Sequence, residues 1–198
     1  MDRKKLLKGI ILTAVMVVLI VGYYCYLSSR NEKLNSAQNA EKQAEEMTAV
    51  EELLARSEFK EYPTTPVQVV KYYNEITACF YNEQYTEEQL QRLAELTRTL
   101  FDKELVANQT FEDYLEALKN DIEVFKAGNI RIYSSEVTPS TDVFYFEHDG
   151  YQCARLNSVY SLKSGTNYQT SKEIYILRKD EANHWKIMGF KLDKGEDS

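Results

Sequence analysis

The hydrophobic pattern begins with one long apolar run, residues 9–27, in which no side chain is charged. As a helix this run would span about 28 Å, close to the roughly 30 Å hydrocarbon thickness of a bilayer. Tyrosines gather at its C-terminal end, as in the aromatic belt of a membrane interface. Four basic residues precede it within residues 1–8: Arg3, Lys4, Lys5 and Lys8. The positive-inside rule therefore predicts a cytoplasmic basic tail at 1–8, a single transmembrane helix at 9–27, and the rest of the chain outside the cytoplasm.

A cleaved signal peptide is the alternative interpretation of this run. Its apolar core would be about 7–15 residues long and would end at small residues, whereas this run is longer and ends in bulky tyrosines. A lipoprotein site at Cys25 would also need a small residue before it, and Tyr24 is large. The pattern therefore favours an uncleaved signal-anchor in the cell membrane.

Residues 28–62 form a second region, rich in Ala, Glu, Gln and Lys and free of Pro and Gly. These residues favour helix. The apolar positions from Leu34 to Leu54 recur at roughly helical spacing, but half of them are alanine, and a coiled coil needs a sustained heptad of large apolar residues. The sequence predicts a solvated helical stalk, with a weak dimerising coiled coil as the alternative.

Residues 64–127 show the period of three amphipathic helices, each with a start signal. Thr65, Thr86 and Thr110 are suitable N-caps, and the glutamine three residues after each of the first two predicts a capping box. Large apolar residues follow each cap at helical spacing. Gly128 is a suitable C-terminal stop.

After Gly128 the pattern changes to strands rich in Tyr, Val, Ile and Phe, separated by turn residues. The predicted strands are 130–137, 143–148, 151–163, 168–178 and 184–192. Asp149-Gly150 is a strong hairpin signal. Helices grouped first and strands grouped second predict an α+β domain over residues 64–193, with helices on an antiparallel sheet, and a short tail at 194–198.

The pattern of the last predicted strand resembles that of a known superfamily. Trp185 and Ile187 alternate with polar neighbours, which places both on the buried face. Three helices, a bent antiparallel sheet and a closing His-Trp-Lys-Ile-Met-Gly-Phe strand after an acidic turn resemble the nuclear transport factor 2-like (cystatin-like) superfamily. With its anchor and acidic stalk, the whole chain also resembles single-pass envelope proteins of Gram-positive bacteria that carry this domain.

That resemblance implies a cone-shaped fold with a cavity between the helices and the sheet. Aromatic side chains crowd the first helix and the strands, and they indicate either a packed aromatic core or an apolar pocket with a tyrosine-rich rim. The candidate pocket-lining residues are Tyr73, Phe80, Tyr160, Trp185 and Ile187. Members of the superfamily include isomerases, dehydratases, ligand-binding proteins and assembly modules, and fold alone does not choose among them.

The charge limits the partners that the domain can bind, and the cysteine content limits the metal and disulfide sites that it can contain. The net charge of the whole chain is −7. Residues 1–30 have a net charge of +4, so residues 31–198 have a net charge of −11. An acidic domain of this kind repels nucleic acid. Cys79 and Cys153 are too few for a zinc site or disulfide framework. They are expected as small core residues, with a disulfide as the alternative.

No catalytic or metal motif is present, and nothing in the sequence calls for a cofactor. His148 stands in the Glu147–Asp149 hairpin turn, where neighbouring side chains point to opposite faces and cannot easily share one ion. Acidic residues elsewhere fall in helix first turns and in loops. We therefore expect no carboxylate or histidine deep in the cavity with a catalytic partner beside it, with Glu136 and Glu173 as the strand residues most able to overturn this.

The sequence thus predicts a membrane-anchored extracytoplasmic accessory protein with a non-catalytic domain. This domain binds a small ligand, another protein or a second copy of itself. One alternative is a subunit of an envelope secretion or conjugation complex. The other is an isomerase- or dehydratase-type enzyme of the same fold, which would need a buried carboxylate of raised pKa.

Overall fold

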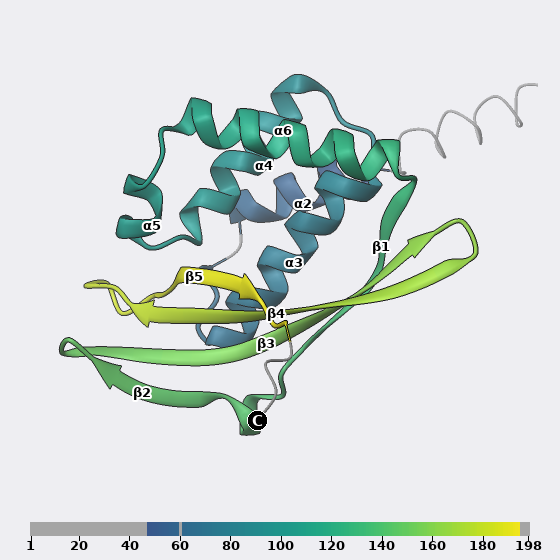
Figure 1. Ribbon diagram of the computed structural model, residues 1–198. Coiled ribbons are helices and arrows are strands. Elements are labelled where there is room, and N and C mark those ends of the chain that lie inside the picture. The colour runs from purple at the N-terminus through teal and green to yellow at the C-terminus, as the bar shows by residue number, and fades with distance from the viewer. Residues whose placement is uncertain (1–46, 60, 195–198) are drawn as a thin grey trace, which may run out of the picture. The chain divides into compact units, whose positions relative to one another are not determined.

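The structure is a computed structural model that describes residues 47–59 and 61–194. In these residues five α-helices are followed by a five-stranded antiparallel sheet, which confirms the α+β class (Figure 1). The helices are α2 (Ala49–Phe59), α3 (Pro66–Asn82), α4 (Glu87–Thr99), α5 (Lys103–Ala107) and α6 (Phe111–Ala127). The strands are β1 (Ile130–Val137), β2 (Phe144–His148), β3 (Tyr151–Ser164), β4 (Asn167–Lys179) and β5 (Trp185–Leu192), with a 3₁₀ turn, η1 (Ser140–Asp142), before β2.

Among the helices of the described residues, none combines the length and the apolar composition that a membrane crossing requires. The predicted transmembrane helix at 9–27 lies outside those residues. So do the basic tail, the first part of the stalk and the last four residues of the C-terminal tail.

The three long helices begin at the predicted threonine caps. In each case the threonine hydroxyl accepts a hydrogen bond from the backbone N–H three residues on, in the pairs Thr65–Gln68, Thr86–Gln89 and Thr110–Asp113. Of these three helices, α4 alone has the reciprocal capping box, because the Gln89 side chain accepts from the Thr86 backbone. The box predicted for α3 is wrong, since the Gln68 side chain accepts from Thr64 instead.

The end of the predicted stalk differs from a solvated spacer. Residues 49–59 form α2, and its Val50, Leu53 and Leu54 are buried in the core of the domain. The compact unit accordingly starts at Thr48 rather than at residue 64. Spacing of i, i+3 and i+4 puts these three side chains on one face.

The sheet has the order β1-β3-β4-β5, and β2 pairs with β3 beside β1. The long β3 therefore serves two partners on one edge: β1 pairs with its second half and β2 with its first. Asp149 and Gly150 between β2 and β3 both have positive φ, at 50° and 78°, as a two-residue type I′ hairpin requires. Each predicted strand is present within two residues of its predicted bounds.

The helices cover one face of the sheet, with α3 nearest to it (Figure 1). The core lies between these layers. Its largest fully buried apolar side chains are Ile76, Leu93, Leu100, Leu156, Tyr175, Leu177 and Ile187. Trp185, 6% exposed, belongs to the same cluster.

The segment between α4 and α5 is fixed to the sheet. Leu100 accepts a backbone hydrogen bond from Ile187, and Asp102 donates one back, both at 2.8 Å. The Asp102 carboxylate also accepts two hydrogen bonds of 2.7 Å from Arg178 on β4. Asp102 is the N-cap of α5, a helix too short to show a period in the sequence. These contacts hold Phe101 and α5 against the end of the sheet, where a cavity begins.

Candidate functional site

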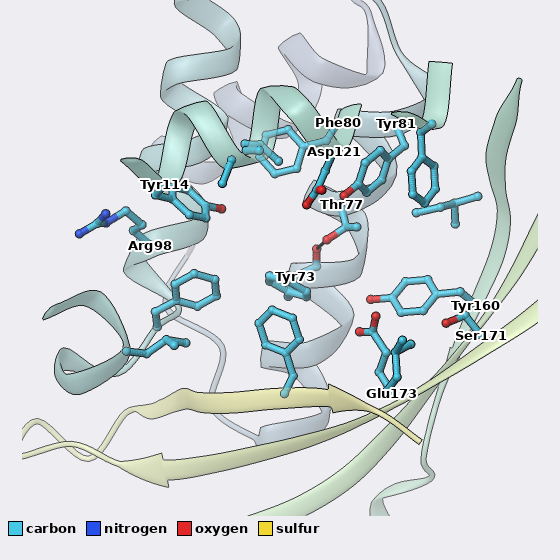
Figure 2. A pocket seen from close by; sticks show the side chains of 18 of the residues that line it. Tyr73, Thr77, Phe80, Tyr81, Arg98, Tyr114, Asp121, Tyr160, Ser171 and Glu173 are labelled. Carbon is cyan, nitrogen blue, oxygen red and sulfur yellow. Dashed lines mark hydrogen bonds between the residues drawn. The ribbon is translucent and has the colours of Figure 1, made fainter. Parts of the chain in front are cut away.

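A cavity of about 520 Å³ lies between α3, α6, the α4–α5 segment and the sheet (Figure 2). Its wall is mainly aromatic and aliphatic, with few polar groups. The lining side chains are Tyr73, Thr77, Phe80, Tyr81, Arg98, Phe101, Leu105, Val106, Gln109, Tyr114, Ala117, Leu118, Asp121, Phe125, Ile132, Tyr160, Leu162, Ser171, Glu173, Phe190 and Leu192. This volume suits a small organic molecule.

The cavity opens to solvent along α6 and the end of β5. Ala117 and Asp121 on α6 are exposed, and so are Phe190 and Leu192 on β5. A ligand can thus enter past these residues without a change in the helices or the sheet.

Glu173 brings a carboxylate into this apolar wall. It lies on β4 between Ser158 of β3 and Leu192 of β5, and its side chain points into the cavity (Figure 2). Tyr175, two residues on and so on the same face, donates a hydrogen bond of 2.5 Å to its Oε2. Burial raises the pKa of Glu173 above its ordinary value, and the hydrogen bond from Tyr175 offsets this only in part.

A chain of polar contacts continues from Tyr175 into the core. Its hydroxyl lies 3.0 Å from that of Tyr160 on β3. Tyr160 in turn donates to Asn74 Oδ1 on α3 at 2.5 Å, and the Asn74 amide donates to Ser158 Oγ at 2.8 Å. All four of these side chains are buried, with no more than 4% exposed. Their polar atoms therefore depend on one another for hydrogen bonds.

Aromatic rings from α3, the α4–α5 segment and β5 form another part of the wall. The ring of Tyr73 lies between 5.8 and 5.9 Å from the rings of Tyr175, Phe190 and Phe101. Burial holds the pKa of Tyr73 well above its ordinary value, so its hydroxyl stays protonated. The wall thus offers ring faces and neutral hydroxyl groups.

Two further charged residues reach the cavity. Asp121 on α6 is exposed at its opening. Arg98 donates to the backbone carbonyls of Val106 and Thr110, and its guanidinium points away from Glu173 (Figure 2). Arg98 therefore ties α4 to the chain between α5 and α6, and Glu173 is the charged group set deepest in the wall.

The structure separates the residues expected to line a pocket into two groups. Tyr73, Phe80 and Tyr160 lie in the cavity wall. Trp185 and Ile187 lie in the closed core instead, since Ile187 is covered by the α4–α5 segment and Trp185 packs near Tyr145. Strand alternation identifies a buried face, but it does not distinguish a packed core from a cavity wall.

The expectation that no carboxylate lies in the cavity with a partner is wrong for Glu173. A signal was present in the sequence, because Glu173, Tyr175 and Leu177 share one face of a strand. The other strand candidate, Glu136 on β1, is exposed and does not line the cavity.

The histidines and cysteines lie elsewhere. His148 and His184 do not line the cavity, and each lies near an aspartate of its own turn. Cys79 and Cys153 are free, buried thiols. Burial raises the pKa of Cys79 to about 11 and also raises that of Cys153, which suits core residues.

Comparison with known proteins adds one match. The model of the family DUF6715, described as a domain of unknown function, matches residues 1–190. The chain belongs to the DUF6715 family. The match starts at the first residue, so the pattern of DUF6715 includes the apolar run at 9–27 as well as the α+β domain. No curated protein matches the chain.

Proposed function

We propose that this DUF6715 protein binds a small, mostly apolar molecule in the cavity and acts on it by acid–base chemistry through Glu173, as an isomerase- or dehydratase-type enzyme. The observation that carries this proposal is the carboxyl group of Glu173. It faces an apolar cavity, has a raised pKa and accepts a hydrogen bond from a buried tyrosine.

This arrangement supports proton transfer for a physical reason. A general acid or base works best when its pKa lies near the working pH, and burial moves an ordinary glutamate in that direction. Tyr175 can stabilise the carboxylate after the proton has left. Groups placed in this way typically contribute about 10²–10⁴-fold to a reaction rate.

The fold and the location form part of the proposal. Helices on one face of an antiparallel sheet, with a cavity between the two layers, support the cone of the nuclear transport factor 2-like superfamily. The uncharged run at 9–27 and the basic residues before it support an anchor that holds the domain outside the cytoplasm. The substrate would then be an extracytoplasmic small molecule.

Binding without catalysis is the second candidate. One observation favours it: the titratable groups of the cavity wall are Glu173, the exposed Asp121, Arg98 and tyrosines, and none of the described lining residues is a histidine. The domain would then be a ligand-binding accessory module.

The test has two stages and uses the full-length protein. Neutral small molecules are first selected by affinity to the wild type and counter-selected against Ala117→Trp, which fills the opening from an exposed helical position. The retained compounds are then incubated in D₂O, and deuterium uptake, double-bond shift and water loss are followed by mass spectrometry. Glu136→Gln is the matched control, since it changes an exposed strand glutamate.

Acid–base catalysis predicts turnover by the wild type and by Glu136→Gln, with a loss of about 10²-fold or more in Glu173→Gln. Selective binding without turnover by any variant would overturn the enzyme proposal in favour of the binding module. If every compound that the wild type binds is also bound by Ala117→Trp, so that none survives the counter-selection, the cavity is not the site.

A further inference from the structure

The sheet has a second face, which is turned away from the helix layer (Figure 1). Residues opposite each other on paired strands share a face, and alternate residues of a strand point to opposite faces. The strand register therefore assigns five rows of side chains to this surface, which we call the outer face. The rows are Phe144, Arg155, Ile176 and Gly189; Asn157, Ile174 and Lys191; Glu136, Val159 and Lys172; Ser134, Ser161 and Thr170; and Arg131, Lys163 and Tyr168.

The outer face is basic, although the chain as a whole is acidic. Its rows contain five basic side chains and one acidic side chain, Glu136. The helices have the reverse charge, because residues 64–127 contain twelve acidic and six basic residues, a net charge of −6. The domain thus has an acidic helix layer and a basic sheet face, and such a separation of charge orients a protein at a charged surface.

Four of the five basic side chains have no ion-pair partner among the described residues. The exception is Lys172, whose Nζ lies 2.7 Å from an oxygen of Asp193. Arg131 and Lys191 are exposed on the two strands at opposite edges of the sheet, β1 and β5. The positive charge is therefore available to an external anionic group, and it extends across the width of the sheet.

Exposed aromatic rings lie beside these charges at both ends of the outer face. At one end, the Arg155 guanidinium lies 5.1 Å from the ring centre of Phe144. At the β3–β4 hairpin, the Lys163 ammonium lies 5.5 Å from the ring centre of Tyr168, and Tyr133 packs edge-on against the same ring. Each of the three rings is more than half exposed. Contact with a less polar surface would remove this apolar area from water.

We propose that the outer face docks on the surface of an anionic lipid bilayer, the one in which the predicted segment 9–27 is anchored. The inference rests on the membrane anchor of the proposed function and is independent of catalysis by Glu173. Residues 28–46 connect the predicted anchor to the domain, and at about 3.4 Å per residue they reach at most about 65 Å. A tether of this length keeps the domain at a high effective concentration near the bilayer.

The composition of the outer face favours lipid over a protein partner. Protein–protein interfaces are depleted in lysine, and their aromatic anchors cluster near the centre. Here three of the five basic residues are lysines, and the exposed rings lie at the ends. Tyr and Phe rings among Lys and Arg side chains suit a membrane interface, where the rings enter the headgroup region and the charges reach the phosphates. A symmetric contact between two copies would instead place two basic faces against each other.

Docking through the outer face also orients the cavity. An anionic bilayer attracts the outer face and repels the acidic helix layer. The helix α6, along which the cavity opens, then lies on the side of the domain away from the bilayer (Figure 1). A ligand therefore enters the cavity from the aqueous side.

The test measures the accessibility of lysine side chains while the full-length protein is anchored in lipid nanodiscs, with one copy per disc. One set of discs contains phosphatidylcholine alone, and the other contains equal amounts of phosphatidylcholine and anionic phosphatidylglycerol. A short pulse of acetylation is followed by peptide mass spectrometry. Lys163 and Lys172 report on the outer face, and Lys71 and Lys126, which are exposed on α3 and α6, are the references.

At low salt, the two outer-face lysines should be acetylated about fivefold or more slowly in the anionic discs than in the neutral discs. The reason is that each basic residue near an anionic surface favours the bound state by about fivefold. The two reference lysines should react equally in both kinds of disc. About 1 M salt should remove the difference, because the Debye length falls to about 3 Å.

Two double variants locate the effect. Arg131→Glu combined with Lys191→Glu should abolish the slower acetylation of the outer-face lysines in anionic discs. Lys71→Glu combined with Lys126→Glu changes the net charge by the same amount on the helices and should retain it. All four positions are exposed, and thermal unfolding checks that both variants are folded.

Equal acetylation of the outer-face lysines in both kinds of disc would overturn the proposal. So would the same slowing at the reference lysines, or loss of the effect in both double variants, since net charge alone predicts these results. Association with neither kind of disc would refute the anchor and the docking together. No arm of the test depends on a substrate, so its failure is distinct from a failure of the proposed catalysis.

Discussion

The buried ion pair between Asp102 and Arg178 fixes one wall of the cavity, and removing its carboxylate should be costly. Asp102 is 2% exposed and Arg178 8% exposed, and two hydrogen bonds of 2.7 Å join them. Breaking a buried pair from one side typically costs about 3–5 kcal/mol, because the other charge stays buried and unpaired. Glu104 still contacts Arg178 at 2.6 Å, which places this loss near the lower end of that range.

Asp102 also caps α5 through the Glu104 backbone N–H, and loss of an N-cap costs about 1 kcal/mol. Asp102→Ala should therefore lower the free energy of unfolding by about 4 kcal/mol, a large part of the roughly 5–15 kcal/mol of a typical domain. Urea unfolding of the full-length protein, followed by circular dichroism at neutral pH, measures this difference.

Two companion variants test the reasoning. Glu181→Ala removes the partner of Lys103 in an exposed ion pair of 3.6 Å, and it should change stability little. Arg178→Met added to Asp102→Ala should restore part of the loss, because the unpaired guanidinium is gone. If Asp102→Ala costs no more than Glu181→Ala, the pair does not hold the α4–α5 segment, and this account of the cavity wall fails.

Four further predictions concern the described domain and the orientation of the chain. The hydrogen bonds from Arg178 and the Glu104 backbone outweigh burial and hold the pKa of Asp102 below its ordinary value. The stability difference between wild type and Asp102→Ala should therefore be complete above about pH 4 and shrink as the pH falls through the folded-state pKa of Asp102, as acid-to-neutral urea titrations will show. Trp185→Ala should cost about 3–5 kcal/mol, and an unchanged melting temperature would mean that this face is not buried. Cys79 and Cys153 should be alkylated much more slowly in the folded protein than in urea, and peptide mass spectrometry showing equal rates would contradict their burial. Protease added to intact cells stripped of their wall should digest residues 31–198, and full protection would refute the proposed orientation.

Local sequence signals predicted the main elements because each rests on a local physical cause. A threonine with a donor N–H three residues on begins a helix, and Asp149-Gly150 closes a hairpin, whatever surrounds them. The burial of α2 and the presence of α5 were not predicted, although α2 does begin at such a threonine, Thr48, whose hydroxyl accepts from the Glu51 N–H. The buried stripe of α2 contains Val50 and Leu53, which were hidden beside a longer alanine pattern, and the short α5 depends on a carboxylate that pairs with a strand far along the chain.

The position of Glu173 could not be predicted for a different reason. Strand period places it on the same face as Tyr175, but the same period places Gln169 there too, and Gln169 is exposed. The difference is how far the helices extend over the sheet, since the β3–β4 hairpin runs beyond them (Figure 1). Coverage by α3 and α6 starts near residue 171, so Glu173 lies at the boundary between the open hairpin and the closed core.

This boundary also explains why a glutamate is tolerated here. Deeper in the sheet an ionised carboxyl would lose its hydration without replacement, and a few residues nearer the turn it would keep an ordinary pKa in water. At residue 173 the side chain is half-buried and has Tyr175 as its hydrogen-bond partner. The buried polar chain behind it adds no apolar contact and has a cost in desolvation. Packing alone would favour apolar residues at Asn74 and Ser158, so the stability of the fold does not by itself explain the chain of contacts from Asn74 to Glu173.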